Sequence, residues 1–273
     1  MRLGPGEYFG EPLSQRRLGP ALLVLSAYRP GPLQSWHVHS NPGFILLLDG
    51  DHCDHWRHER VAQSALSLIY HPTWEPHAGQ VGPLGMLGLN IEIAQSWLDS
   101  LDLRERSLGG WQLLNSVEWR IRALRFLAFT GQFQTRLETD METEALELLE
   151  PLLEVSRGIE QTRTPAWLRR AEELIRDLFQ DPLTLRRIAS EARVHPIYLA
   201  RVFRRRHGCS VSEYIRALRL AHAGELILQQ DCSVAESACA AGFCDQAHLA
   251  RWFARAFGYS PKRLQQLRRL RPA

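Results

Sequence analysis

The chain has 273 residues, of which 45% are hydrophobic and 23% are charged, and its formal net charge is +3. This is the composition of a globular protein with enough apolar side chains for a sizeable core. It excludes a mostly disordered chain, a collagen-like repeat and a small disulfide scaffold, and the length corresponds to about two domains.

Three observations bear on the cellular compartment. The amino-terminal segment lacks a basic stretch followed by an apolar run, and no apolar run in the chain is long enough to span a bilayer. The five cysteines are an odd number without C-x-x-C spacing, which favours reduced thiols over a disulfide framework or structural zinc. We therefore expect a cytoplasmic protein without membrane contact.

Charge is distributed unevenly along the chain. Residues 1–158 contain 13 Lys and Arg against 19 Asp and Glu, a balance of −6, whereas residues 159–273 contain 20 against 11, a balance of +9. This asymmetry is expected if the second part binds a polyanion and the first part has a different role.

The first hundred residues have the pattern of β-structure. Short apolar runs at 21–27, 43–48, 65–70 and 84–93 are separated by turns rich in Pro, Gly and Asp. Several short strands at this spacing predict a sandwich or a barrel.

Helical periodicity replaces the strand pattern after residue 111. One apolar face combines Val117, Ile121, Leu124 and Ala128, and a second combines Leu146, Leu149 and Leu153 above an acidic outer face. We expect two amphipathic helices within about 111–158, packed on the barrel or on a second copy of the chain.

A domain boundary is predicted at residues 159–165, which are polar and aperiodic. Thr164 and Pro165 have the form of a helix cap followed by proline at the first helical position, so a helix should run from 166 to about 180. The sequence thus predicts an α+β protein of two domains, 1–158 and 166–273.

The last ninety residues contain an internal repeat with an offset of 50 positions. The run LARVF at 199–203 recurs as LARWF at 249–253. In each copy a short helix, at 185–191 or 234–239, precedes a tight turn and a longer helix, about 196–207 or 245–257. This is the pattern of two helix-turn-helix units.

The longer helices have the chemistry to recognise DNA in the major groove. Arginine pairs bidentately with guanine, glutamine with adenine, and small apolar groups contact the thymine methyl. A helical bundle with a solvated arginine face is the alternative, but two basic units in register favour DNA. The predicted contact residues are Ile197, Tyr198, Ala200, Arg201, Arg204 and Arg205 in the first unit and Gln246, Ala247, His248, Ala250, Arg251 and Arg255 in the second.

The segment from Ser233 to Leu264 resembles the signature of AraC-family transcription regulators, including Ala241-Gly242-Phe243, Phe257-Gly258 and Ser260-Pro261. The resemblance implies two helix-turn-helix units joined by a connecting helix at about 212–229, with two recognition helices in successive major-groove segments. The family's base-reading positions fall on Ile197, Ala200 and Arg201, and on Gln246, Ala247, Ala250 and Arg251. His195 departs from the family pattern, which usually has a capping serine there.

The first half resembles a cupin barrel in two short motifs. Trp36 to His39 with Gly43 and Gly50 is similar to the first cupin motif, and Tyr70-His71-Pro72 with His77 is similar to the second. AraC-family proteins often carry such a barrel as an effector and dimerisation domain. The predicted effector-binding residues are Trp36, His37, His39, Phe44, Tyr70, Trp74 and His77.

Three of these histidines allow a second interpretation, because neutral imidazoles are good ligands for Zn, Fe, Ni or Cu. His37, His39 and His77 could hold such a metal. However, Gly43 and Phe44 occupy the region where a metal-binding cupin supplies a carboxylate, so hydrogen-bonded histidines without metal are favoured.

Together these patterns predict a sequence-specific, effector-responsive DNA-binding transcription regulator. The resemblance implies activation through contact with RNA polymerase, and a homodimer would place four helix-turn-helix units on double-stranded DNA. The alternative is a metal-dependent cupin enzyme with a helical appendage. An RNA-binding or architectural protein would need exposed aromatic platforms or wedges, whereas the aromatic residues here lie on predicted buried faces.

Overall fold

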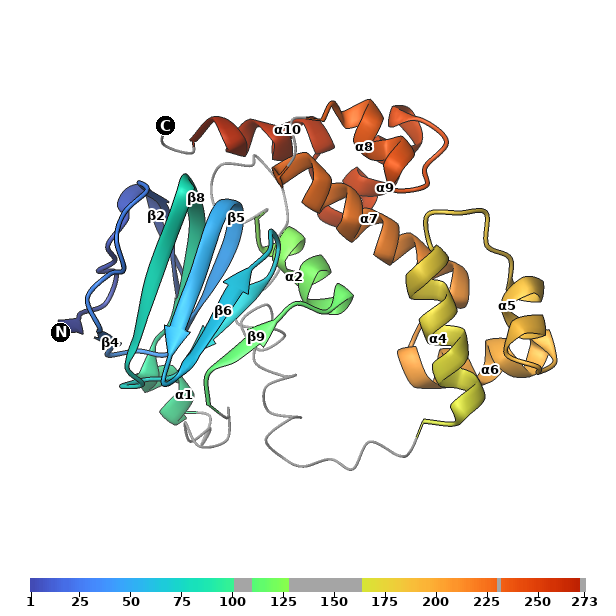
Figure 1. Cartoon of the computed structure of the whole chain (residues 1–273), viewed down its shortest axis with the longest axis horizontal. Helices are drawn as coiled ribbons and strands as arrows, with labels where there is room; N and C mark the ends of the chain where they lie inside the picture. Colours follow the sequence, from blue (N-terminus) through green and yellow to red (C-terminus); the bar gives the residue numbers. More distant parts are fainter. Residues whose placement is uncertain (101–109, 128–163, 230–231, 271–273) are drawn as a thin grey trace.

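The computed structural model describes residues 1–100, 110–127, 164–229 and 232–270. It has a mixed α/β fold in which a sheet-rich amino-terminal region is followed by a helical carboxy-terminal region, as the sequence predicts (Figure 1). None of the helices in these ranges has the length and apolarity needed to cross a membrane.

The main sheet has seven strands and is built around the long antiparallel pair β5 and β8. The strand order is β2-β3-β8-β5-β7-β9. β7 pairs with the first part of β5, and β6 pairs with the last part of β5 on the same edge. A separate parallel pair joins β1 and β4. The strands are β1 (Arg2–Leu3), β2 (Glu11–Leu18), β3 (Ala21–Tyr28), β4 (Val38–His39), β5 (Gly43–Trp56), β6 (Glu59–Gln63), β7 (Leu68–His71), β8 (His77–Ile93) and β9 (Gln112–Leu114).

Both faces of the central strands are buried, which explains why their sequences read as continuous apolar runs. Along β5, Phe44, Leu46 and Leu48 belong to a core shared with helices, whereas Ile45 and Leu47 belong to a second core. Successive side chains of a strand point to opposite faces, so one apolar run serves both cores.

The predicted closed barrel is not confirmed. Within the described residues the strand order runs from β2 to β9 without a pairing that joins these two edges. Two irregularities in the pairing of β5 with β8, at Leu47/Asp49 and at Gly50/His52, interrupt the register of the long strands.

The segment after residue 110 begins as a strand, not as the predicted helix. Gln112–Leu114 forms β9 and pairs with β7, and helix α2 (Val117–Leu127) begins only afterwards. Trp119, Ala123, Leu124, Phe126 and Leu127 are its buried residues. A short helix, α1 (Gln95–Ser100), follows β8. The second helix expected before residue 158 lies outside the described residues, as do residues 159–163 of the expected linker.

The predicted helices of the second half are confirmed with small shifts at their ends. Pro165, not Thr164, is the N-cap residue of α4, and no side chain caps that helix. Thr184 and Ser233 do cap the short helices, and Ser233 forms the predicted capping box with Glu236. The helices are α4 (Ala166–Leu178), α5 (Leu185–Glu191), α6 (Pro196–His207), α7 (Val211–Gln229), α8 (Val234–Ala240), α9 (Gln246–Phe257), α10 (Pro261–Gln266) and the 3-10 helix η2 (Leu267–Leu270).

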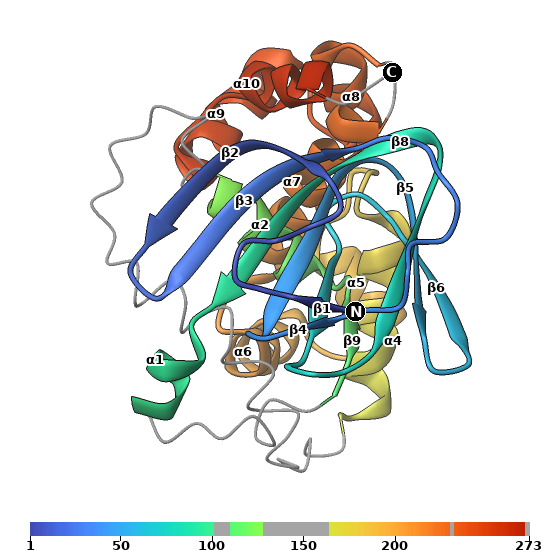
Figure 2. The ribbon, with the colours of Figure 1, turned by 90° about the vertical axis from the view of Figure 1, so that its left-hand side faces the viewer.

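Helix α7 is shared between two hydrophobic cores. Val211 and Ile215 near its start pack with α4, α5 and α6, whereas Ala223 and Ile227 near its end belong to the core that also contains residues of the sheet, α2, α8 and α9. Accordingly, α4 to α6 lie on the far side of α7 from the sheet in Figure 1, and α8 to α10 lie along one end of the sheet in Figure 2.

The connecting helix α7 and the second helix-turn-helix unit pack directly on the amino-terminal region. A Cβ at Gly224 of α7 would lie 3.1 Å from Leu66 Cδ1 and from Leu124 Cδ1, so glycine permits a close helix–helix approach. The hydroxyl of buried Tyr259 donates to the Leu124 carbonyl at 2.7 Å, and Arg120 of α2 forms an ion pair with Glu225 of α7.

The turns of the two units use the same backbone conformation with different residues. Arg193 in the first turn has φ of 57°, and Gly242 in the second has φ of 82°. A Cβ at Gly242 would also lie 2.3 Å from the Gln180 carbonyl oxygen. Glycine is therefore required in the second turn by contact as well as by conformation.

We predict that Gly242→Ala destabilises the protein by about 2–5 kcal/mol, because it adds a backbone clash to the cost of a positive φ. Gly208→Ala is the matched control, since Gly208 has φ of 69° and no atom within 4 Å of its built Cβ. Urea unfolding followed by circular dichroism measures both. Equal losses in the two variants would contradict the role assigned to the Gln180 contact.

Candidate functional site

The two longer helices, α6 and α9, have the same length and similar ends. Each has 12 residues and stops at a glycine in the left-handed conformation, Gly208 or Gly258. His195 caps α6 by accepting from the Ile197 backbone N–H at 3.3 Å, and Asp245 caps α9 by accepting from His248 N–H at 2.6 Å. Histidine can thus replace the serine typical of this cap.

One face of each helix is buried, as predicted from the apolar stripes. Leu199 and Phe203 of α6 are fully buried, as are Leu249, Phe253 and Phe257 of α9. Burial of these side chains fixes the rotation of each helix about its axis, and with it the residues that face outward.

The outward faces carry most of the predicted DNA contacts. Ile197 is 74% exposed, which is unusual for a large apolar side chain and leaves it available for another surface. Ala200 and Ala250 are half-buried at the edges of these faces. The remaining exposed members are Arg201, Arg204 and Arg205 on α6 and Gln246, Ala247, Arg251 and Arg255 on α9.

Several predicted contact residues also make contacts within the protein. Arg201 lies over the ring of Tyr198, Arg204 lies 3.9 Å from the Glu213 carboxylate, and Arg255 lies over the ring of Trp252. The ring of Tyr198 packs on Trp167 of α4, with centroids 5.3 Å apart. His248 accepts from the Trp252 indole N–H at 3.1 Å and lies edge-on to Phe243.

Arg219 of α7 connects the two helix-turn-helix units through one guanidinium group. It donates to the carbonyl of Phe179 at 2.6 Å, of Gly242 at 2.7 Å and of Asp181 at 2.8 Å. Phe179 and Asp181 follow α4 in the first unit, and Gly242 is the turn of the second. The planar fork of arginine holds these three acceptors in a fixed geometry that lysine cannot reproduce.

Sequence reasoning did not find Arg219, because it looked for residues on outward faces. Hydrogen bonds from charged donors each contribute about 1.5–3 kcal/mol. Together with the Gln180–Gly242 approach, they join the segment that follows α4 to the turn that precedes α9. Arg219 therefore fixes the position of the first helix-turn-helix unit relative to the second.

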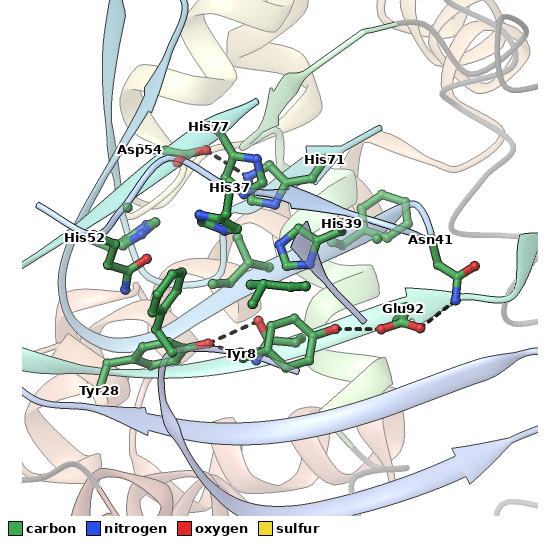
Figure 3. A pocket seen from close by; sticks show the side chains of 18 residues that line it. Tyr8, Tyr28, His37, His39, Asn41, His52, Asp54, His71, His77 and Glu92 are labelled. Carbon is green, nitrogen blue, oxygen red and sulfur yellow. Dashed lines mark hydrogen bonds and ion pairs between the residues drawn. The ribbon is translucent and has the colours of Figure 1, made fainter. Parts of the chain in front are cut away.

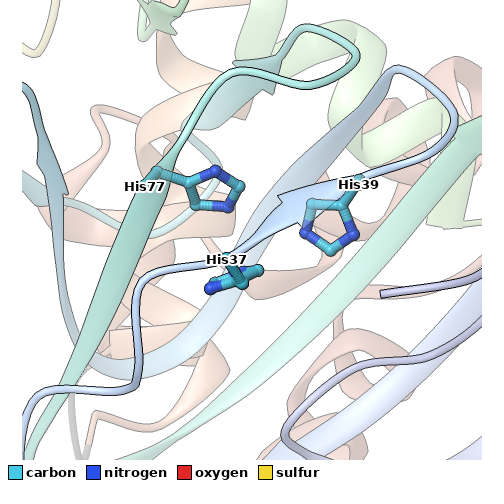
Figure 4. Close-up of side chains that lie close together, drawn as sticks. All are labelled: His37, His39 and His77. Carbon is cyan, nitrogen blue, oxygen red and sulfur yellow. The ribbon is translucent and has the colours of Figure 1, made fainter. Parts of the chain in front are cut away.

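A second candidate site lies on the sheet face that carries Tyr28, Ile45 and Asn90 (Figure 3). It is a cavity of about 50 Å³, which is room for an ion, a few waters or a very small ligand. His37, His39 and His77 line it together, as predicted (Figure 4).

Other predicted effector residues lie elsewhere. Tyr70 is fully buried in the main core, and Trp36 and Trp74 are 44% and 49% exposed, so none of the three lines this cavity. Phe44 is a lining residue, but its ring contacts Tyr70 and Trp119 at centroid distances of 5.3 and 6.4 Å. Strand alternation explains the placement of Tyr70, since its neighbour His71 in β7 lines the cavity and successive side chains point to opposite faces.

The structure adds polar residues that the motifs did not indicate. Asp54 is 1% exposed, and its Oδ2 accepts from His71 at 2.8 Å and from the Trp111 indole at 2.7 Å. Glu92 accepts from Asn41 and Tyr8. The sequence does contain one signal for such residues: Asn90 and Glu92 are polar residues two positions apart in an otherwise apolar run, a spacing that places both on the same face of a strand.

Burial dominates the electrostatics of the cavity. It lowers the pKa of His39 to about 3, and neighbouring imidazoles add to this effect. Burial also lowers the pKa values of His37 and His77. Desolvation opposes ionisation of Asp54, but the adjacent His71 more than offsets it and holds the Asp54 pKa below its ordinary value. The three cavity imidazoles are thus neutral near pH 7.

Comparison with known proteins bears on the helical region. A family described as a helix-turn-helix domain matches residues 188–267. The transcriptional regulator GlxA of Rhizobium meliloti is 34% identical over 105 residues, which cover 38% of this chain and 32% of that protein. The transcriptional activator RhaS of Escherichia fergusonii is 30% identical over 159 residues, which cover 54% of this chain and 57% of that protein.

The carboxy-terminal region contains a helix-turn-helix domain that is similar to those of AraC-type regulators.

A crystal structure of a transcriptional regulator from Chromobacterium violaceum, described by its AraC-type DNA-binding domain, is 27% identical with a TM-score of 0.36. It aligns with 37% of this chain and 91% of that chain. The chain matches between about a third and somewhat over half of the length of the curated relatives GlxA and RhaS. Both relatives are named as transcription regulators, and neither name supports the enzyme alternative.

We predict that Arg219→Ala makes the AraC-type region tolerant of altered half-site spacing. Loss of three hydrogen bonds frees the angle between α6 and α9, so affinity for a selected full site should fall about tenfold. The penalty for one inserted base pair between half-sites should shrink at the same time. Gel-shift titrations with both duplexes measure this.

Arg219→Lys is the matched control, because it retains the charge but not the three-way fork. We expect it to behave like Arg219→Ala in spacing tolerance while binding non-specific DNA like the original protein. An unchanged spacing penalty in a folded Arg219→Ala variant would contradict the positioning role.

Proposed function

We propose that this protein is a sequence-specific DNA-binding transcription regulator whose sheet-rich region senses a small molecule or ion. The observation that carries the proposal is the pair of helices of equal length, α6 and α9, which present arginine-bearing faces and belong to two units that Arg219 joins. An α-helix of this kind fits the major groove, with residues near its start close to base edges.

The proposed contacts divide into base recognition and phosphate binding. Arg201 and Arg251 lie in the first half of their helices, where a guanidinium can pair with guanine, and Gln246 can pair with adenine. Ile197 is suited to a thymine methyl. Arg204, Arg205 and Arg255 lie further along and suit phosphates, which contribute affinity without sequence preference.

The proposed sensing mechanism uses the packing between the amino-terminal region and the second unit. Phe44 of β5 contacts Trp119 of α2, and α2 contacts α7 through the Arg120–Glu225 ion pair. A ligand that favours one arrangement of these elements would alter DNA affinity. A typical coupling of about 1–3 kcal/mol corresponds to a change of about 5–150-fold.

Three further features belong to the proposal. The sheet would form a cupin-like barrel in the complete fold, the protein would act in the cytoplasm as a homodimer, and activation would involve contact with RNA polymerase. The homodimer is supported by the symmetry of most soluble oligomers and by the advantage of doubling the number of helix-turn-helix units on one DNA site.

We predict that Arg251→Ala costs about 1–3 kcal/mol of binding free energy and relaxes preference at one base pair, because it removes a base contact. Binding-site selection from random duplexes with the purified protein, followed by gel-shift titration of single-base variants, measures this. Arg29→Ala removes an exposed charge of the sheet region and should leave site preference unchanged.

We predict a different result for Arg205→Ala. Loss of a phosphate contact should weaken binding to all sequences alike and should reduce the slope of log affinity against log salt by about one unit. Titrations at several salt concentrations measure the slope. Sequence-independent losses of equal size for Arg205→Ala and Arg251→Ala would refute the division of roles, and a protein without sequence preference would refute the proposed function itself.

A further inference from the structure

The strongest unassigned feature is the group of three imidazoles in the cavity of the sheet region. His37 precedes β4, His39 ends β4, and His77 begins β8, so three positions of two chain segments supply them. One nitrogen from each ring lies within 4.8 Å of the others (Figure 4). His37 and His77 are 5% and 3% exposed.

Backbone hydrogen bonds hold these two chain segments together. His37 and His77 form an isolated antiparallel bridge, in which each backbone N–H donates to the other residue's carbonyl at 2.9 and 3.1 Å. The side chains of a bridged pair lie on the same side of the sheet, and here the ring centroids are 4.3 Å apart. The two imidazoles are thus placed by main-chain geometry.

Hydrogen bonding orients the same two rings. His37 Nδ1 lies 3.0 Å from the Ser35 carbonyl oxygen, and His77 Nδ1 lies 3.1 Å from that of Glu75. A carbonyl oxygen can only accept, so each Nδ1 carries the proton, and the Nε2 of the neutral ring retains its lone pair. Histidines that bind metals typically have this arrangement, in which the outer nitrogen donates to a backbone carbonyl.

The surroundings fit a cation better than a large organic ligand. Asp54 lines the same cavity and is almost fully buried, and its Oδ1 has no hydrogen-bond partner within the described residues. Its other oxygen is fixed by His71 and Trp111. His71 in turn stacks on His77 with centroids 3.9 Å apart. A buried carboxylate beside three lone-pair donors favours a positive charge.

The cavity size supports the same conclusion. About 50 Å³ is much smaller than the 300–1,000 Å³ of typical sites for drug-sized ligands. It suffices for an ion with one or two waters or a small chelating group.

We propose that His37, His39 and His77 bind one divalent transition-metal ion, with its remaining coordination positions open to water or to a small ligand in the cavity. Three imidazoles suit Zn²⁺, Ni²⁺, Co²⁺, Cu²⁺ or Fe²⁺. The site deepens the proposed sensing role, on which its regulatory meaning rests, because an effector with an oxygen or nitrogen donor could complete the coordination. The buried Asp54 would balance the charge of the ion.

The test uses the full chain, stripped with a chelator and titrated with Zn²⁺ alone and with Co²⁺ alone. We expect one equivalent of metal per chain by calorimetry and elemental analysis, together with visible ligand-field absorption of bound Co²⁺. His39→Gln and His77→Gln should each weaken binding at least about tenfold. His58→Gln, at an exposed histidine in the turn between β5 and β6, is the matched control and should retain full affinity.

Separate measurements test whether each variant folds and whether it binds DNA. Circular dichroism of each variant reports whether it folds, and the Co²⁺ spectrum of the original protein needs no variant at all. Absence of stoichiometric binding, or equal binding by the original protein and a folded His39→Gln variant, overturns the metal site. Gel-shift titration of the stripped protein shows whether sequence-specific DNA binding survives, so failure of the metal site is distinguishable from failure of the proposed function.

Discussion

The sharing of helix α7 between two cores is the constraint on which the rest of the structure depends. Its first half packs with α4 to α6, and its second half packs with the sheet region, α2 and the second unit. Arg219, near the middle, donates to carbonyls of both units. Because a helix is stiff over 19 residues, the two helix-turn-helix units are held in one relative orientation. Under the proposed function, a DNA site would have to match that orientation in its half-site spacing.

The packing of α7 and of Tyr259 on α2 connects the amino-terminal region to the helix-turn-helix units. Gly224 allows a close approach to Leu66 and Leu124, and Tyr259 adds a buried hydrogen bond to the Leu124 carbonyl. Packed interfaces of this kind adopt discrete arrangements and resist gradual deformation. A change in the sheet region therefore has a route to α7 that does not require the recognition helices themselves to change.

The cavity buries several polar groups whose desolvation is costly, as binding sites often do. Three neutral imidazoles and the Asp54–His71 pair occupy space that apolar side chains could fill. Buried polar groups are retained where they are paired or where they bind something. The residues of the proposed metal site, His37, His39 and His77, lie apart in the chain from α6 and α9, which carry the proposed DNA contacts.

The sequence by itself determined the elements of the helical half and their outward faces. Helical periodicity, the Ser233–Glu236 capping box and the repeat at 199–203 and 249–253 are local signals, so α5 to α9 could be predicted closely. Tertiary structure alone decided which distant residues meet: Arg219 with Gly242, Tyr259 with Leu124, and Asp54 with His71 and Trp111. It also turned Gln112–Leu114 into a strand and drew Tyr70 into the core. The physical reason is that strand pairing and buried polar contacts join residues far apart in the chain, whereas caps and helical faces depend on neighbours within a few positions.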